Sequence, residues 1–134
     1  MIIADANLIA GFCINSPLTE TAQAVFAKDR SWSAPKLWQS EFVSTLLKYR
    51  RLQKMSANEV MRALYYAESM MGESDYDSDI HEVYRVVNAT GCSAYDSCYI
   101  ALAEEHRVKL VTTDGGILAN APHIALSPEQ FLAA

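Results

Sequence analysis

Two strand-like runs that each end in aspartate constrain this chain more than any other feature. The first run, Met1–Ala4, is followed by Asp5, and the second, Lys109–Thr113, is followed by Asp114. Short apolar runs of this kind are typical of strands buried on both faces of a parallel sheet. Helical patterns separate them. This alternation predicts an α/β fold in which helices cover both faces of a parallel sheet of about five strands.

Local signals predict the remaining elements. Further strands are expected at 31–34, around Tyr76 and at 123–126, and helices at 7–14, 18–28, 35–53, 56–72, 80–90, 94–106 and from Ser127 onward. Pro35 suits the first turn of its helix, and Ser56 with Glu59 forms a capping box. The stripes expected to face the core are Phe42, Val43, Leu46 and Leu47, then Val60, Leu64, Ala67 and Met71, and then Ile80, Val83, Tyr84 and Val87.

Length and charge narrow the class of protein. A chain of 134 residues, 51% of them apolar, predicts a single globular domain over residues 1–134. The net charge of −5 and the pI of about 5.1 argue against a protein that binds nucleic acids by general electrostatic attraction. They do not exclude a nucleic-acid enzyme, because acidic metal ligands contribute to that charge.

Cysteine usage and the N-terminus indicate the compartment. Cys13, Cys92 and Cys98 are odd in number and have no C-x-x-C spacing, which disfavours a zinc site or a disulfide framework. A reduced, cytoplasmic protein fits this pattern. The first residues have no basic region and contain Asp5, unlike a signal peptide. No run approaches the ~20 apolar residues of a membrane span, so no membrane contact is expected.

Glu41 and Asp96 lie near the starts of helices and join Asp5 and Asp114 as candidate site residues. Each of the four acids has an ordinary alternative explanation. Asp5 can cap the helix that follows it, Asp96 can form a capping box with Ser93, and Asp114 suits a turn. Glu41 can be a surface residue of its helix.

The positions of the four acids favour convergence instead. Asp5 and Asp114 end strands that should emerge at the same edge of a parallel sheet, where α/β folds bind ligands. Asp96 heads a stripe with Tyr99 and Ile100 that should face inward, and a buried carboxylate is costly without a partner. Converging carboxylates repel one another unless a divalent cation lies between them. The set predicts a metal site suited to phosphodiester chemistry.

Four short motifs resemble those of the PIN-domain ribonucleases, and above all the VapC-type toxins of bacterial and archaeal toxin–antitoxin pairs. The motifs are Asp5-Ala6-Asn7, Pro35 followed by Glu41, Ser93-Ala94-Tyr95-Asp96, and Thr112-Thr113-Asp114. Their order and spacing agree with the family over nearly the whole chain. The chain departs from the family in one place, because members often carry a basic residue beside the last aspartate and this chain has Thr113 and Gly115-Gly116 there.

The resemblance implies a PIN-like three-layer sandwich and an endoribonuclease with Mg²⁺ or Mn²⁺ as cofactor. The family's catalytic acidic quartet is matched by Asp5, Glu41, Asp96 and Asp114, and the polar residues that support it by Asn7 and Thr112. Three of the acids, Asp5, Asp96 and Asp114, are expected to hold the metal directly or through water. Glu41 is expected to orient the attacking water or to help bind a second ion. RNA is the implied substrate, an antitoxin protein the implied inhibitor and a homodimer the implied working unit.

Other functions fit the sequence less well. A phosphoacceptor signalling domain needs an acidic pair after the first strand and a lysine after a late strand, and both are missing here. A hydrolase with an aspartyl nucleophile needs Asp-x-Asp where this chain has Asp5-Ala6-Asn7. A catalytically inactive PIN-like binding module and a housekeeping RNA-processing nuclease stay open as alternatives, although an inactive copy is expected to lose acids.

Two further clusters have a functional and an ordinary interpretation. The basic residues Lys48, Arg50, Arg51 and Lys54 either contact the RNA backbone or form the solvated end of a helix, and the second interpretation is preferred. The large side chains of the helix at 56–72 either form a partner-binding patch or pack in the core, and core packing is preferred. These side chains are Met61, Tyr65, Tyr66, Met70 and Met71.

Overall fold

Five short parallel strands form the centre of the fold in the computed structural model, which describes residues 1–134. The strands are β1 (Ile2–Ala4), β2 (Trp32–Pro35), β3 (Asp75–Tyr76), β4 (Leu110–Val111) and β5 (Ala125–Leu126). Their order in the sheet is β3-β2-β1-β4-β5, so β1 lies at the centre. The predicted α/β class and the five-stranded parallel sheet are confirmed.

The register of β1 brings two chain segments together at one edge of the sheet. Ile3 pairs with Ser33 of β2 on one side and with Leu110 of β4 on the other. Every residue of β1 and β4 is buried, as expected for a sheet covered on both faces. The Asp5 N–H donates to the Val111 carbonyl at 3.1 Å. The residues that follow β1 and β4 therefore lie side by side.

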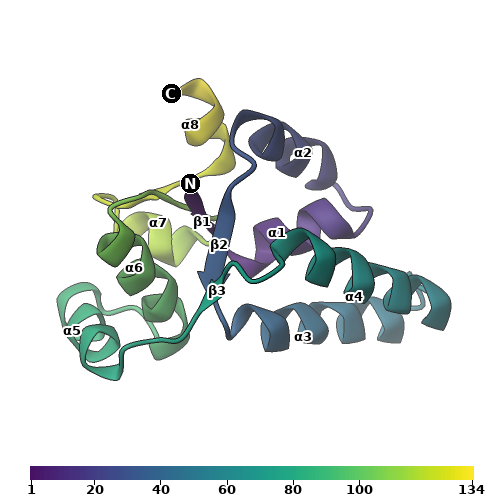
Figure 1. The fold of residues 1–134 in the computed structure, drawn as a ribbon, viewed down its shortest axis with the longest axis horizontal. Coiled ribbons are helices and arrows are strands. Elements are labelled where there is room, and N and C mark those ends of the chain that lie inside the picture. Colours follow the sequence, from purple (N-terminus) through teal and green to yellow (C-terminus); the bar gives the residue numbers. More distant parts are fainter.

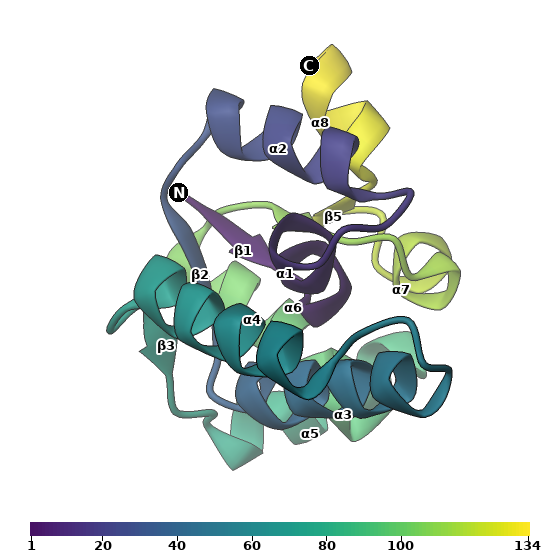
Figure 2. The ribbon, with the colours of Figure 1, turned by 90° about the vertical axis from the view of Figure 1, so that its right-hand side faces the viewer.

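Helices cover the two faces of the sheet. They are α1 (Ala6–Cys13), α2 (Thr19–Lys28), α3 (Trp38–Arg51), α4 (Ala57–Met71), α5 (Ile80–Thr90), α6 (Ala94–His106), α7 (Gly115–Asn120) and α8 (Pro128–Ala133). On one face α6 packs against β1, β2 and β4, and α5 packs on α6. Helix α1, with α2, α3 and α4 around it, lies on the other face (Figures 1 and 2). None of these helices combines the length and apolar character that crossing a membrane requires.

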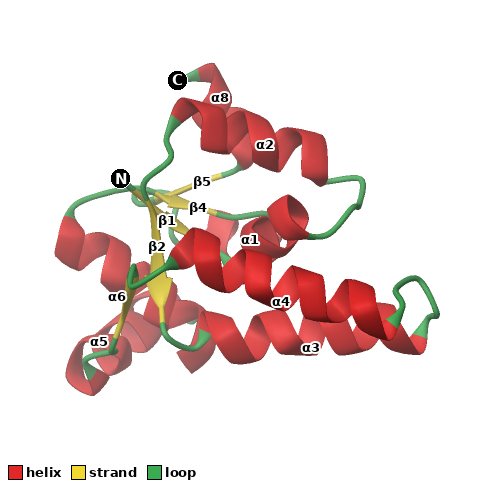
Figure 3. Cartoon of the chain, turned by 45° about the vertical axis from the view of Figure 1, so that its right-hand side comes forward, coloured by secondary structure: helices red, strands yellow, loops and turns green.

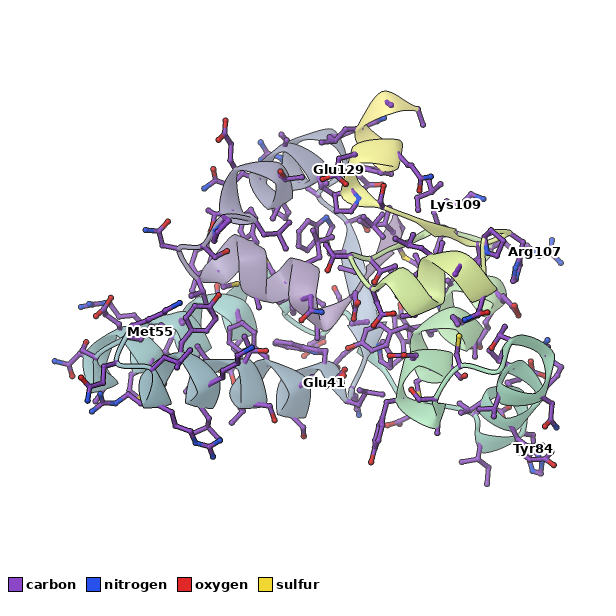
Figure 4. The ribbon with its side chains drawn as sticks, turned by 180° about the vertical axis from the view of Figure 1, so that it is seen from behind. Glu41, Met55, Tyr84, Arg107, Lys109 and Glu129 are labelled. Carbon is purple, nitrogen blue, oxygen red and sulfur yellow. The ribbon has the colours of Figure 1, made fainter.

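Helices α3 and α4 run side by side and project beyond the sheet (Figures 1 and 3). We refer to residues 38–71, which comprise both helices and the loop between them, as the α3–α4 arm. Figure 4 places Glu41 at the end of the arm near the sheet and Met55 at the far tip. The predicted capping box of Ser56 and Glu59 starts α4 at this tip. One end of the arm therefore reaches the sheet edge and the other reaches solvent.

Pro35 ends β2 and does not start α3, so its predicted position was wrong. It pairs with Tyr76 of β3, and the Lys36 N–H, one residue later, donates to the Tyr76 carbonyl at 2.9 Å. A proline is tolerated at this place because the ladder takes its hydrogen bond from the next residue. Helix α3 begins three residues after Pro35, at Trp38.

Several side chains expected in the core are exposed. On α3, Phe42 and Leu46 are buried, but Val43 and Leu47 are 42% and 48% exposed. On α5, the buried residue is Val86, whereas Ile80 and Tyr84, which were expected to face the core, are 76% and 68% exposed. Each of these helices meets the rest of the protein along a narrower face than its apolar pattern suggests.

The aromatic and methionine residues of α4 also correct the sequence interpretation. Met71 is buried and Met70 half-buried, as core packing predicts. Met61, Tyr65 and Tyr66 are instead 48%, 68% and 51% exposed. The preferred core-packing interpretation is therefore wrong for these three residues, and they lie on an exposed apolar surface of the arm.

Candidate functional site

Four carboxylates surround one cleft at the carboxyl edge of the sheet. Asp5 follows β1, and Asp114 follows β4 at the start of α7. Glu41 comes from the first turn of α3 and Asp96 from the first turn of α6. All four line a cleft of about 400 Å³. The structure thus brings together the four acids named from the sequence, while their catalytic and metal-binding roles stay predictions.

Thr112 links the two acids that follow the strands. Its hydroxyl donates to Asp5 Oδ2 at 2.5 Å and accepts from the Asp114 N–H at 3.0 Å. The other oxygen of Asp5, Oδ1, accepts from the Ala6 N–H at 2.7 Å, which makes Asp5 the N-cap of α1. Thr112 is fully buried, so its single hydroxyl proton is directed to Asp5. This geometry agrees with the supporting role expected for Thr112.

The Asp5 carboxyl is the most strongly perturbed acid of the cleft. Burial raises its pKa from 3.8 to about 6, and only 7% of the residue is exposed. The hydrogen bonds from Thr112 and Ala6 lower the pKa, whereas the charges of Glu41 and Asp96 raise it further. The ionised form of Asp5 is therefore disfavoured in the cleft unless a positive charge lies nearby.

Glu41 is oriented by a tyrosine from the opposite helix of the cleft. The Tyr99 hydroxyl donates to Glu41 Oε1 at 2.7 Å. Burial raises the pKa of Tyr99, and so does the adjacent Glu41, so the hydroxyl keeps its proton and acts as the donor. Burial also raises the pKa of Glu41; the Tyr99 hydrogen bond lowers it and the charge of Asp96 raises it. Glu41 is therefore held in place while its charge is partly disfavoured.

Asp96 and Asp114 complete the cleft. Burial raises the pKa of Asp96, and the charge of Asp114 raises it further. The Asp96 N–H donates to the Ser93 hydroxyl at 3.1 Å, which caps α6, and a hydrogen bond between Ser93 and the Asp96 carboxyl lowers the pKa of this acid. Asp96 also lines the cleft. Asp114 caps α7, with its Oδ1 accepting from the Ile117 N–H at 2.9 Å. Capping and a place in the cleft thus coincide in Asp5 and Asp114.

The two glycines after Asp114 differ in what surrounds them. A Cβ on Gly116 would lie 3.1 Å from Asp114 Oδ1, whereas a Cβ on Gly115 would meet no atom within 4 Å. The absence of a side chain at Gly116 therefore gives the Asp114 carboxylate room to cap α7.

Asn7 lies at the rim of the cleft and not within the carboxylate network. Its side chain lines the cleft and is exposed. The Asp5 oxygens take their hydrogen bonds from Ala6 and Thr112. Thr112 therefore makes hydrogen bonds to the quartet and Asn7 makes none to Asp5, while the supporting roles of both residues stay predictions.

Sequence analysis missed four residues of the site. Ser44, Thr45 and Tyr95 line the cleft, and Tyr99 was assigned to an apolar stripe. Spacing carried a signal, because Ser44 and Thr45 lie three and four residues after Glu41, on the same helical face. Tyr99 likewise lies three residues after Asp96, on the same face of α6.

The donor set of the cleft suits a hard divalent cation. Carboxylate oxygens dominate it, with the Asn7 amide and the hydroxyls of Ser44 and Thr45 beside them, and Mg²⁺ and Mn²⁺ prefer such ligands. As the side chains lie, no group of three or more histidine, cysteine or carboxylate residues is arranged so that it could hold a metal ion.

The basic cluster at the end of α3 lies away from this cleft. Lys48, Arg50, Arg51 and Lys54 are all exposed, and none of them lines the cleft. They lie toward the tip of the arm, where Figure 4 labels Met55. Their positions agree with the solvated helix end that was preferred from the sequence.

Comparison with known proteins identifies the family. The model of the PIN domain matches residues 2–123, and this chain therefore belongs to the PIN-domain family, whose members are typically metal-dependent nucleases. Among solved structures, the crystal structure of PAE2754 from Pyrobaculum aerophilum is similar, with a TM-score of 0.76. The two chains are 23% identical, over 98% of this chain and 86% of that one, which shows a shared fold. A comparison with curated proteins found no match.

Proposed function

We propose that this chain is a Mg²⁺- or Mn²⁺-dependent endoribonuclease that hydrolyses RNA phosphodiester bonds, and that it is the toxin of a toxin–antitoxin pair. One observation carries the nuclease proposal: four acids from four separate elements line one cleft at the carboxyl edge of a PIN-domain sheet. The raised pKa of Asp5, Glu41 and Asp96 supports it, because a cation would relieve the repulsion between these groups.

The residues of the cleft divide the chemistry between them. Asp5, Asp96 and Asp114 would hold the metal, which when bound lowers the pKa of a water molecule and neutralises charge on the phosphate. Glu41 Oε1 is fixed by the Tyr99 hydroxyl, so Oε2 is available to orient the attacking water and to take its proton. Its raised pKa makes the Glu41 carboxylate a stronger proton acceptor than an ordinary glutamate.

Cleavage of total RNA in Mn²⁺ or Mg²⁺ tests the nuclease. Asp96→Asn should abolish cleavage without unfolding the protein, and EDTA should abolish cleavage by the wild type. Asp77→Asn is the matched control, because Asp77 is an exposed acid that pairs with Lys36 outside the cleft. Full activity in Asp96→Asn would remove that residue from the site.

The exposed apolar surface of the arm supports the proposal that a protein partner binds there. A groove of about 890 Å³, which we name the arm groove, lies between α1 and the arm and is lined by aromatic side chains that include Phe12, Tyr65 and Tyr66. Its charged lining residues are Lys54, Arg62 and one acid, Glu59, so bases outnumber acids. Exposed apolar patches of this kind mark protein-binding surfaces. An antitoxin segment with apolar anchors and acidic residues would complement this groove.

Growth assays separate a toxin from a housekeeping nuclease. Expression of the wild type should arrest bacterial growth, Asp96→Asn should not, and co-expression of a cognate antitoxin should restore growth. Tyr66→Ser should keep the toxicity and lose the rescue, because it removes an anchor of the arm groove. Growth unaffected by an RNA-cleaving wild type would favour the housekeeping role. Light scattering tests the proposed homodimer directly.

A further inference from the structure

A second hollow adjoins the cleft that holds the acids. Its volume is about 280 Å³, and its walls come from α1, the α1–α2 loop and α3, with Thr113 at the edge. We name it the side hollow. Asn7 and Thr45 line both the side hollow and the acid cleft. The two spaces are therefore neighbours that share a wall, and a polymer held at the acids would pass beside the side hollow.

The side hollow differs from the acid cleft in charge. None of its nine lining residues is an acid or a base, whereas four acids line the cleft. An uncharged lining offers a phosphate no opposite charge, although it suits an uncharged heterocycle. Its volume lies just below the range of ~300–1,000 Å³ that is typical of small-molecule sites. A single base therefore fits it better than a peptide segment does.

The side hollow presents the groups that recognise bases. Asn7 and Thr113 are exposed, and their amide and hydroxyl groups can both donate and accept hydrogen bonds, as base edges require. The half-buried ring of Tyr49 supplies an aromatic surface of the kind on which single-stranded bases stack. Thr45 Oγ1 donates to the Glu41 carbonyl at 3.1 Å, which leaves its lone pairs as acceptors.

The loop that forms one wall is held by its own hydrogen bonds. The Ser16 N–H donates to Thr19 Oγ1 at 3.0 Å, the Leu18 N–H donates to Ser16 Oγ at 3.2 Å, and Thr19 Oγ1 donates to the Ile14 carbonyl at 2.8 Å. A Cβ on Gly11 would lie 2.7 Å from Leu18 Cδ2, so glycine lets the loop close against α1. A preformed wall binds a ligand without an ordering cost.

We propose that the side hollow binds the base of the nucleotide next to the scissile phosphate and thereby sets the base preference of cleavage. Asn7 and Thr113 would contact the edge of the base, and Tyr49 its face. The assignment of RNA as the ligand rests on the proposed ribonuclease function. The side hollow itself can be tested without catalysis.

Titration with the four uncharged nucleosides, followed by amide NMR shifts in EDTA, tests base binding alone. One nucleoside should shift the amides of Gly11, Leu18 and Thr113 at lower concentration than the other three do. Thr113→Val, which keeps the shape of an exposed side chain, should weaken that binding about three- to tenfold. Tyr49→Leu should weaken it about fivefold or more. Tyr84→Leu, on the exposed side of α5, is the matched control and should change nothing.

Cleavage of an RNA library with randomised sequence provides the second measurement. The wild type should prefer one base beside the cut, Thr113→Val and Tyr49→Leu should flatten this preference, and Tyr84→Leu should keep it. The proposal is overturned if the nucleoside shifts fall outside the side hollow, or if both hollow variants keep wild-type binding. Absence of cleavage with normal nucleoside shifts would count against the ribonuclease and not against the base site.

Discussion

The acid cleft and the α3–α4 arm share a helix, yet local sequence determines them to different degrees. At the sheet edge, each acid lies where its strand or helix begins or ends, and the strand register brings Asp5 and Asp114 together. On the arm, Phe42 is buried while its neighbour Val43 is 42% exposed, although both belong to one apolar stripe.

This difference shows what an apolar pattern can and cannot specify. A strand at the centre of a sheet meets protein on both faces, so burial follows from its position alone. A helix that projects from the domain meets protein on one side only. Of two adjacent apolar residues, one can then be buried while the other is exposed. The boundary between them depends on the angle at which α3 meets α1 and α4, which is a tertiary property.

The largest predicted effect is on stability, and it should distinguish a buried residue of α3 from its exposed neighbour. Phe42→Ala removes a fully buried ring that packs edge-on against Trp38, with ring centroids 5.8 Å apart, and should lower the free energy of unfolding by about 3–5 kcal/mol. Val43→Ala, one residue along, should lower it by less than about 1 kcal/mol. Urea unfolding measures both, and equal losses would mean that Val43 is also covered in solution.

The pH dependence of stability tests the burial of Asp5. Because the folded-state pKa of about 6 lies above the ordinary 3.8, the folded protein binds more protons between these values. The stabilising contribution of Asp5 is complete below about pH 3.8 and is lost as the pH rises through about 6. At ~1.4 kcal/mol per pH unit, Asp5→Asn should gain about 3 kcal/mol over the wild type between pH 4 and pH 7.5. Urea titrations in EDTA would reveal this, and parallel curves for the two proteins would contradict it.

Removal of the Tyr99 hydroxyl tests how Glu41 is held. Tyr99→Phe removes the hydrogen bond that lowers the pKa of Glu41, so this pKa should rise and the acidic limb of the cleavage profile should move to higher pH. Stability should fall by about 1–2 kcal/mol. Tyr84→Phe alters an exposed ring far from the cleft and serves as the control. An unmoved profile would show that Glu41 does not act in its ionised form.

The smallest effect concerns the two glycines before α7. Gly115→Ala meets open space and should stabilise the protein by about 0.5 kcal/mol, because alanine loses less entropy in a helix. Gly116→Ala should gain less than this, since its Cβ would press on Asp114 Oδ1, and it should weaken Mn²⁺ binding as well. Thermal unfolding and a Mn²⁺ titration of the two variants measure the difference. Identical Mn²⁺ binding by the two variants would show that the Asp114 carboxylate can shift away from the added methyl group without loss of binding.

The sheet and the four acids could be predicted from the sequence because they depend on local strand and helix patterns. The only further rule needed is that parallel strands end at the same edge of a sheet. A strand-ending acid needs only its own strand and the parallel register of its neighbour. The hydrogen bond between Tyr99 and Glu41 joins residues 58 positions apart on different helices, and no local pattern specifies it. The prediction that Pro35 starts a helix was wrong because β2 continues through Pro35, which pairs with Tyr76 of β3. That pairing is a long-range contact that the local helix signal does not reveal.

The double use of two acids as helix caps has a consequence for how inactive relatives would look. Asp5 and Asp114 cap α1 and α7, and asparagine or serine caps a helix nearly as well as aspartate. A descendant that lost its activity would therefore keep a short polar side chain at these two positions for reasons of folding alone. The Glu41 carboxylate caps no helix but accepts the hydrogen bond of the buried Tyr99 hydroxyl, so the fold has its own reason to keep it. No helix cap depends on the Asp96 carboxylate in this way. An acid at position 96, more than at 5, 41 or 114, would therefore distinguish an active relative from an inactive one in this architecture.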